Sequence, residues 1–458
     1  MAACWRSCLF PATSATHARN SGGRVTWPVF DIHTPRNTEG ERAMLFNRGR
    51  AVDYMREYGL DVLVATTPVN ITYFTDYYCW LDPLFKEYMM VPGASSNLSQ
   101  AYAVFPLESE PALVVNPLFA ANAEDLWVKD LHIFGSAGLD DSLPAGELPE
   151  SLLRFQELLL SPHDNATSTD ALLSILKQRG LTGARIGLET EGLPPETKDV
   201  IEQALPDASL KGCSDLIRMV RMVKTAEEIQ RLTRSAEINE QAAMESLATA
   251  RPGLAVSEMA DHYRALAAQM GADFDHFAFG VRGLGMTTET GYRLAEDDVL
   301  YVDYGCIYRY CFSDSGTTLA MRELTAELNS RFAALRACMD AGEEALRPGA
   351  KSSSVAGAMV AALHDRGITA SFPHGHGVGL EVRDYPVLVP DNGLRIKDDC
   401  VDLPSDLSLE ADMVLNLEAP LFMPGVGSLH IEQSYVVTQQ GSRPLVEQHR
   451  RRPVVIGQ

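Results

Sequence analysis

Ionisable residues interrupt several apolar segments in the C-terminal half of this chain. The run 299–305 (VLYVDYG) is rich in β-branched and aromatic residues but contains Asp303, and Glu418 directly follows the apolar run 413–417 (MVLNL). Short apolar runs of this kind are typical of buried strands. Because a buried carboxylate is costly unless a cation lies beside it, the pattern indicates strands that converge on a shared cation site.

Three further residues have the same setting. Asp314 follows Asp303 by eleven residues, His376 lies in the glycine-rich sequence HGHGVG, and Glu432 lies in the strand-like sequence LHIEQSYVV. Four carboxylates and one imidazole that meet in a cleft can bind two divalent ions about 3.5–4 Å apart. Oxygen-rich ligation with one histidine favours manganese, iron or cobalt over a structural zinc. We predict two divalent ions, Mn first and Fe, Co or Zn as alternatives, held by Asp303, Asp314, His376, Glu418 and Glu432.

The same half contains a repeated pattern. The tripeptide Arg-Pro-Gly occurs at 251–253 and 347–349, and Gly271 and Gly367 follow at the same offset of 96 residues. Each tripeptide opens a helical stretch, and a glycine-rich, strand-like segment comes after it. The repeat predicts two similar halves of helices and sheet that face each other, with a cleft at their junction.

The N-terminal half alternates between strand-like and helical patterns from about residue 40 to 215. The segments 60–66 and 184–188 are predicted strands, 101–105 and 112–115 a predicted hairpin, and 196–205 a predicted helix. The segment contains neither of the glycine-rich motifs that cradle phosphates. We therefore expect an independent α/β domain.

A predicted helix start marks the beginning of the second domain and therefore the boundary between the two domains. Thr225 and Glu228 have capping-box spacing ahead of an amphipathic stretch that runs to Leu247. The boundary is expected at about 215–222, which assigns 41–218 to the α/β domain and 219–458 to the second domain. Residues 1–40, with no acidic residue before position 31, are expected to be a disordered extension.

Composition limits the partners. The 458 residues include 61 acidic and 39 basic side chains, a formal net charge of −22. Such a surface repels nucleic acid and anionic lipid, and no apolar run approaches the roughly 18–20 residues that a membrane helix needs. The eight cysteines form no CxxC pair, which is typical of reduced thiols. We expect a cytoplasmic protein that acts on a small molecule or a short peptide.

The ordered motifs resemble a known family. Asp303-x10-Asp314, His376-Gly-Val-Gly-Leu, Glu418-Ala-Pro and Ile431-Glu432 are similar to the metal motifs of the pita-bread metalloenzymes, among them prolidase, aminopeptidase P, methionine aminopeptidase and creatinase. The segments NITYFTDY and RMVKTAEE resemble the family's creatinase-type N-terminal domain and the helix that leads into its catalytic domain. The resemblance implies an α/β domain, an α+β pita-bread domain with an internal pseudo-duplication, and a homodimer.

The resemblance also implies roles for the predicted ligands. Asp314 and Glu432 would bridge two metal ions, Asp303 would hold one ion, and His376 and Glu418 would hold the other. Glu418 would carry a proton. The implied activity is the metal-dependent hydrolysis of an amide C–N bond, most simply an Xaa-Pro bond.

Two departures from the family pattern leave the chemistry open. Family peptidases have a histidine about sixteen residues before the first metal aspartate, where this chain has Thr287 and Thr288, and a His-Glu or His-Asp pair where it has Arg383-Asp384. Arginine cannot shuttle protons at neutral pH, but it can bind a carboxylate through two parallel hydrogen bonds. We therefore include Arg383 among the candidate catalytic residues.

Two histidines could replace the missing ones. His374 and His430 each lie two residues before a predicted ligand, so on a strand each shares a face with that ligand. Either could act in catalysis beside Glu418, or it could orient a ligand by a hydrogen bond.

Three functions remain. The first is an Xaa-Pro peptidase. The second is a non-peptidase that acts on a small carboxylate metabolite, by ectoine-type ring hydrolysis or by dimethylsulfoniopropionate-type elimination. The third, a catalytically silent binding module, is disfavoured by the complete set of five ligands.

Overall fold

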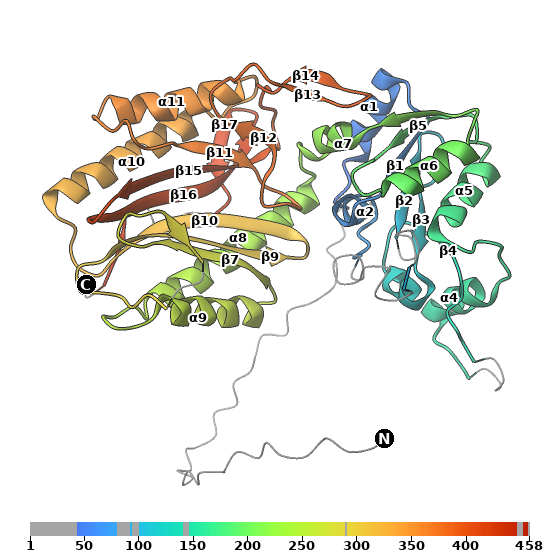
Figure 1. Ribbon diagram of the computed structural model, residues 1–458, viewed down its shortest axis with the longest axis horizontal. Helices are drawn as coiled ribbons and strands as arrows, with labels where there is room; N and C mark the ends of the chain where they lie inside the picture. Colours follow the sequence, from blue (N-terminus) through green and yellow to red (C-terminus); the bar gives the residue numbers. More distant parts are fainter. Residues whose placement is uncertain are drawn as a thin grey trace, which may run out of the picture. The chain divides into compact units, whose positions relative to one another are not determined.

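The computed structural model describes residues 44–79, 92–93, 100–140, 146–288, 291–446 and 452–456 (Figure 1). The predicted N-terminal extension, 1–40, lies outside these ranges. Within them, no helix combines the length and the apolarity that crossing a membrane requires.

A six-stranded mixed sheet organises the N-terminal domain. Its order is β4-β3-β2-β1-β5-β6, with antiparallel pairs β1–β2 and β2–β3 and parallel pairs elsewhere. The strands are β1 (Val62–Ala65), β2 (Tyr102–Pro106), β3 (Ala112–Val115), β4 (Asp130–Ile133), β5 (Arg185–Leu188) and β6 (Ser209–Gly212). The residues of β1, β2 and β3 are all buried, which explains why these strands are continuous apolar runs. The predicted strands and hairpin are confirmed.

Helices pack around this sheet. They are α1 (Arg48–Tyr58), α2 (Pro68–Thr75), the 3₁₀ helix η1 (Pro117–Ala123), α4 (Glu150–Leu160), α5 (Ser168–Gln178), α6 (Pro195–Ala204) and α7 (Ser214–Arg221). The predicted helix at 196–205 corresponds to α6.

The helix predicted from Thr225 is α8 (Ala226–Leu247). The Thr225 hydroxyl accepts a hydrogen bond from the Glu228 backbone N–H at 3.2 Å. The reciprocal bond of a capping box is not formed, because the Glu228 carboxylate is buried instead. The predicted boundary falls within α7, and the domain limits 41–218 and 219–458 stay predictions.

The C-terminal domain is built on one large sheet. Its order is β12-β11-β15-β16-β10-β9-β7-β8, with β17 beside β16 and β18 beside β10. The strands are β7 (Asp273–Gly280), β8 (Met286–Thr287), β9 (Val299–Tyr308), β10 (Cys311–Ala320), β11 (His374–Gly377), β12 (Asp384–Leu388), β15 (Val414–Met423), β16 (Gly427–Thr438), β17 (Gly441–Pro444) and β18 (Val454–Val455). A separate two-stranded sheet joins β13 (Arg395–Lys397) to β14 (Asp402–Pro404).

The predicted duplication is visible in this arrangement. Helices α8 and α9 (Val256–Gln269) pack on β7, β9 and β10, while α10 (Ala326–Ala345) and α11 (Ser352–His364) pack on β11, β15 and β16 (Figure 1). Gly253 and Gly349 both adopt left-handed φ values, +84° and +83°. A residue with a side chain would be strained in this backbone conformation. The two halves meet where β10 pairs with β16.

Candidate metal centre

The five predicted ligands come from five neighbouring strands. Asp303 lies on β9, Asp314 on β10, His376 on β11, Glu418 on β15 and Glu432 on β16. Register brings them together: Gly305 lies opposite Asp314, and Glu418 lies opposite Glu432. Directly opposed residues of antiparallel strands project from the same face, so these side chains gather over one face of the sheet.

Two carboxylates link the cluster. Asp314 groups with His276 and Asp303 on one side and with His376 and Glu432 on the other, and Glu432 also groups with Glu418 and His430. Within each group the ligand atoms lie within 4.8 Å of one another. The shared positions of Asp314 and Glu432 fit the bridging role that the resemblance implies, and that role stays a prediction.

The buried atoms of this cluster fit a divalent cation. His376 is fully buried, and its Nδ1–H donates to the Gly377 carbonyl at 3.0 Å. Its Nε2 has no hydrogen-bond partner among the described residues, and Asp314 Oδ2 lies 3.4 Å away. A neutral imidazole whose lone pair faces carboxylates is the usual arrangement of a metal-binding histidine.

The pKa shifts of two buried carboxyls in the cluster also fit a cation site. Burial raises the pKa of Glu432 well above its usual range, and the charges of Asp314 and Asp303 add to the effect. Although burial raises the pKa of Asp314, the neighbouring imidazoles of His276 and His376 lower it below its usual range. Opposite shifts on adjacent buried carboxyls are typical of carboxylates that share one site. A divalent ion bound there would favour the ionised form of both carboxyls.

His430 orients Glu432. It is fully buried, and its Nε2–H donates to Glu432 Oε2 at 3.0 Å, while Asn416 Nδ2 donates to Oε1 at 2.6 Å. Burial lowers the pKa of His430 to about 3, so the ring is neutral. Of the two roles considered for this residue, the geometry supports the orienting one.

His374 and Arg383 converge on Glu418. His374 Nε2 lies 2.7 Å from Glu418 Oε1, and Arg383 Nη2 donates to the same oxygen at 2.9 Å. The hydrogen bond to Glu418 raises the pKa of His374, although burial opposes it. The side chain of Arg383 is 56% exposed and that of His374 16% exposed. The arginine can therefore contact Glu418 and still present donors to a ligand.

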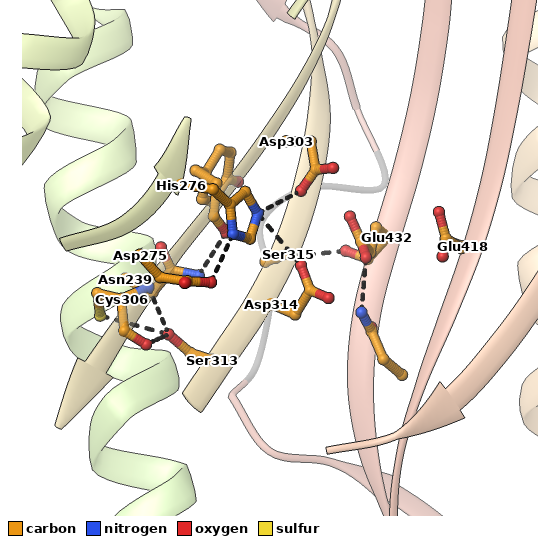
Figure 2. A network of polar contacts seen from close by, with 12 residues as sticks. Asn239, Asp275, His276, Asp303, Cys306, Ser313, Asp314, Ser315, Glu418 and Glu432 are labelled. Atoms are coloured by element: carbon orange, nitrogen blue, oxygen red, sulfur yellow. Dashed lines mark hydrogen bonds and ion pairs between the residues drawn. The ribbon is translucent and has the colours of Figure 1, made fainter. Parts of the chain in front are cut away.

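His276, which is not one of the five predicted ligands, also lies at the cluster. It lies on β7, with Nε2 2.9 Å from Asp303 Oδ1 and 3.5 Å from Asp314 Oδ1 (Figure 2). The signal was present, since His276 interrupts the apolar sequence FDHFAF as the carboxylates interrupt theirs. Thr287, at the position of the missing family histidine, lies on β8 opposite Phe279.

An apolar cavity of about 570 Å³ adjoins the cluster. Ile307 and Phe312 line it and pair across β9 and β10, two residues beyond the pair Gly305–Asp314. The same face of the sheet thus continues from the cluster into the cavity, about 7 Å further along the strands. Other lining residues are Pro68, Val69, Thr72, Tyr78, Cys79, Tyr310 and Leu380, together with the charged Asp273 and Arg309.

Two family models cover most of the chain. The model for the creatinase/prolidase N-terminal domain matches residues 48–223, and the model for metallopeptidase family M24 matches residues 230–439, which contain all five predicted ligands. The chain belongs to the M24 metallopeptidase family. The M24 family implies divalent metal ions, and the chain is a metal-dependent hydrolase.

Individual relatives agree with this assignment. An Xaa-Pro dipeptidase of Lactobacillus delbrueckii subsp. lactis is 22% identical over 413 residues, 87% of this chain and 96% of the relative. The probable dipeptidase PepE of Mycobacterium tuberculosis is 28% identical over 236 residues, 50% of this chain and 60% of the relative.

Solved structures share the fold. The prolidase from Pyrococcus horikoshii OT3 superposes with a TM-score of 0.63 at 19% identity, covering 88% of this chain and 98% of that one. The dipeptidase PepE from Mycobacterium ulcerans gives a TM-score of 0.65 at 20% identity, covering 89% and 96%. The predicted fold class, an α/β domain followed by a pita-bread domain, is confirmed.

Proposed function

We propose that this M24 metallopeptidase hydrolyses the Xaa-Pro bond of short peptides. The observation that carries the proposal is the set of overlapping ligand groups on one sheet face, joined by Asp314 and Glu432. Relatives named Xaa-Pro dipeptidase that align with 87–88% of this chain support the substrate class.

Asp303, Asp314, His376, Glu418 and Glu432 would hold two divalent ions, Mn first, with Fe, Co or Zn as alternatives. When bound, such ions polarise a carbonyl and lower the pKa of a water molecule. His430 and Asn416 hold Glu432 by both oxygens, which fixes the carboxylate between the two halves of the domain.

The remaining residues would bind the substrate and move the proton. Arg383, half-exposed beside Glu418, would bind the carboxylate of the peptide. The leaving proline nitrogen needs a proton, and the pair His374–Glu418 holds one between Nε2 and Oε1. The apolar cavity beside Ile307 and Phe312 would hold the side chain that precedes proline, because it is much larger than a proline ring.

The test is a cleavage assay by mass spectrometry on the purified full chain loaded with Mn²⁺. We expect proline release from Xaa-Pro dipeptides, and its loss in Asp314→Ala. Intact peptides in the presence of two bound ions per chain would overturn the proposal.

One observation favours a second candidate. Arg383 replaces a family histidine and contacts Glu418, an arrangement that also suits a small carboxylate metabolite. Ectoine and dimethylsulfoniopropionate therefore belong in the same assay. Turnover of either, together with intact peptides, would select this second candidate.

We also propose that the protein acts in the cytoplasm as a homodimer. Five cysteines within the described residues, Cys213, Cys306, Cys311, Cys338 and Cys400, are free thiols, as in proteins of reducing compartments. The homodimer follows from the family resemblance, and light scattering of the purified chain would measure it.

A further inference from the structure

We propose that His276 is a sixth protein ligand of the metal centre, so that each half of the domain supplies one histidine and two carboxylates. The inference rests on the metal centre of the proposed function and extends its predicted set of five ligands. Four observations support it.

The first observation is the position of His276 in the duplicated sheet. Reading outward from the junction, one half runs β10, β9, β7 and the other runs β16, β15, β11. The first series carries Asp314, Asp303 and His276, and the second carries Glu432, Glu418 and His376. His276 is thus on the strand that corresponds to the strand of His376.

The second observation is that both imidazoles are held in the same way. His276 Nδ1 lies 2.8 Å from Asp275 Oδ2, and His376 Nδ1 lies 3.0 Å from the Gly377 carbonyl. Each ring therefore uses Nδ1–H on a neighbouring acceptor and turns Nε2 to the cluster. A carboxylate behind the ring is a common support of a metal-binding histidine.

The third observation is the spacing of the donor atoms. His276 Nε2 lies 2.9 Å from Asp303 Oδ1 and 3.5 Å from Asp314 Oδ1, and His376 Nε2 lies 3.4 Å from Asp314 Oδ2. Ligands at about 2.0–2.2 Å from one ion are about 3.0 Å apart in an octahedral shell and about 3.4 Å apart in a tetrahedral one. Both contacts of His276 Nε2 thus have the spacing of ligands that share one ion.

The fourth observation is the space that the backbone leaves for the ring. Gly305 lies opposite His276 across β7 and β9, and a Cβ at this glycine would lie 2.4 Å from His276 Cε1. The imidazole therefore lies directly over the strand that carries Asp303, as Figure 2 shows. A second nitrogen donor moves the preference of the centre from Mn²⁺ toward Co²⁺, Fe²⁺ or Zn²⁺.

Proton NMR of the Co²⁺-loaded full chain tests the inference. A histidine bound to Co²⁺ through Nε2 gives a strongly shifted, solvent-exchangeable Nδ1–H signal. We expect two such signals in the wild type and one in His276→Asn. The matched control is His364→Asn, at the exposed end of α11, which should retain both signals.

Metal content, measured by mass spectrometry on the same samples, separates the possible failures. Two bound cobalt ions with a single shifted signal that survives in His276→Asn would overturn the sixth ligand and leave the proposed function intact. A wild type that binds no metal would overturn both.

A more conservative variant, which retains His276, tests the inference if His276→Asn does not fold. Asp275→Asn retains the imidazole but changes the acceptor of its Nδ1–H. We expect one of the two shifted signals to move and the affinity for Co²⁺ to fall on the order of tenfold. Two unmoved signals would contradict the role of His276.

Discussion

Arg383 is a single residue on which the choice of substrate depends. Its guanidinium contacts Glu418 at 2.9 Å while more than half of the side chain stays exposed. We expect Arg383→Ala to raise KM on the order of 10- to 100-fold for an Xaa-Pro substrate with a free carboxylate and much less for the corresponding amide. Arg383→Lys should restore only part of the loss, because an ammonium cannot make two parallel hydrogen bonds.

Steady-state kinetics on the two substrates measure this difference. Arg331→Ala, on the exposed side of α10 where it pairs with Glu327, is the control and should change neither KM. An equal rise for acid and amide would show that Arg383 does not recognise the carboxylate.

Glu228 is a second residue with a separate prediction. Burial raises its pKa from 4.5 to about 7, against the opposing charge of Lys224. Because the folded-state pKa lies above the unfolded value, the wild type loses stability as pH rises from about 4.5 to 7. Glu228→Gln removes this loss, so its free energy of unfolding relative to wild type should increase by about 2–3 kcal/mol between pH 5 and pH 8.

Urea unfolding of both proteins at the two pH values checks the prediction. The metal centre is the same in both proteins, so its own pH dependence cancels in the difference. A difference in free energy of unfolding between the two proteins that is the same at pH 5 and pH 8 would mean that Glu228 ionises normally in the folded chain.

At the scale of elements, the pairing of β7 with β9 decides whether His276 reaches the cluster. In Gly305→Ala the new methyl group would collide with His276 and with the Ser313 carbonyl, which lie 2.4 and 2.7 Å from the Cβ position. We expect a loss of metal affinity on the order of 10- to 100-fold although every donor is retained. Calorimetric titration with Co²⁺ measures the affinity.

Gly357→Ala is the matched control. A Cβ at this glycine of α11 meets no atom within 4 Å, so metal affinity should not change, and the helix should gain roughly 0.5–1 kcal/mol. Unchanged affinity in Gly305→Ala as well would indicate that His276 contributes nothing to metal binding.

The same elements show what the sequence could predict. Asp303 and Glu418 were identifiable because a charge inside an apolar run demands a physical explanation. His276 was not selected, because one imidazole among Phe274, Phe277 and Phe279 can be an ordinary core residue. Its position over Gly305 depends on a register shift between Phe274 and His276, which local sequence does not determine.

At the scale of the whole molecule, a buried ionic network joins the two domains. Arg221 Nη1 donates to Asn70 Oδ1 of α2 at 2.9 Å, and its Nη2 donates to Asp384 Oδ2 of β12 at 3.0 Å. Lys224 Nζ lies 3.6 Å from the same aspartate oxygen. Asp384 directly follows Arg383, so the network connects the N-terminal domain to the turn that carries this arginine.

Removal of one charged partner from this network should strongly destabilise the folded protein. Asp384→Ala leaves Arg221 paired with Glu381 at 2.7 Å but removes the buried carboxylate that lies beside both Arg221 and Lys224. We expect a loss of about 3–5 kcal/mol in the free energy of unfolding. The double variant Arg221→Met/Asp384→Leu should lose less than the sum of the two single variants, since it leaves fewer unpaired charges. Glu327→Ala, which breaks an exposed pair on α10, should cost less than about 1 kcal/mol.

Urea unfolding of the five variants measures these free energies: Asp384→Ala, Arg221→Met, Asp384→Leu, the double variant and Glu327→Ala. A double variant as unstable as the sum of its parts would show that Arg221 and Asp384 act independently.

The duplicated sheet also bears on how the centre distinguishes the two ends of a peptide. With the proposed ligand set, one histidine and two carboxylates from each half, the two sides of the centre would offer the same donors, whereas a peptide bond has two different ends. His374 and Arg383 both belong to the second half and both contact Glu418. We therefore expect the orientation of a bound peptide to depend on His374 and Arg383, where the two halves differ, and not on the metal ligands that the halves have in common.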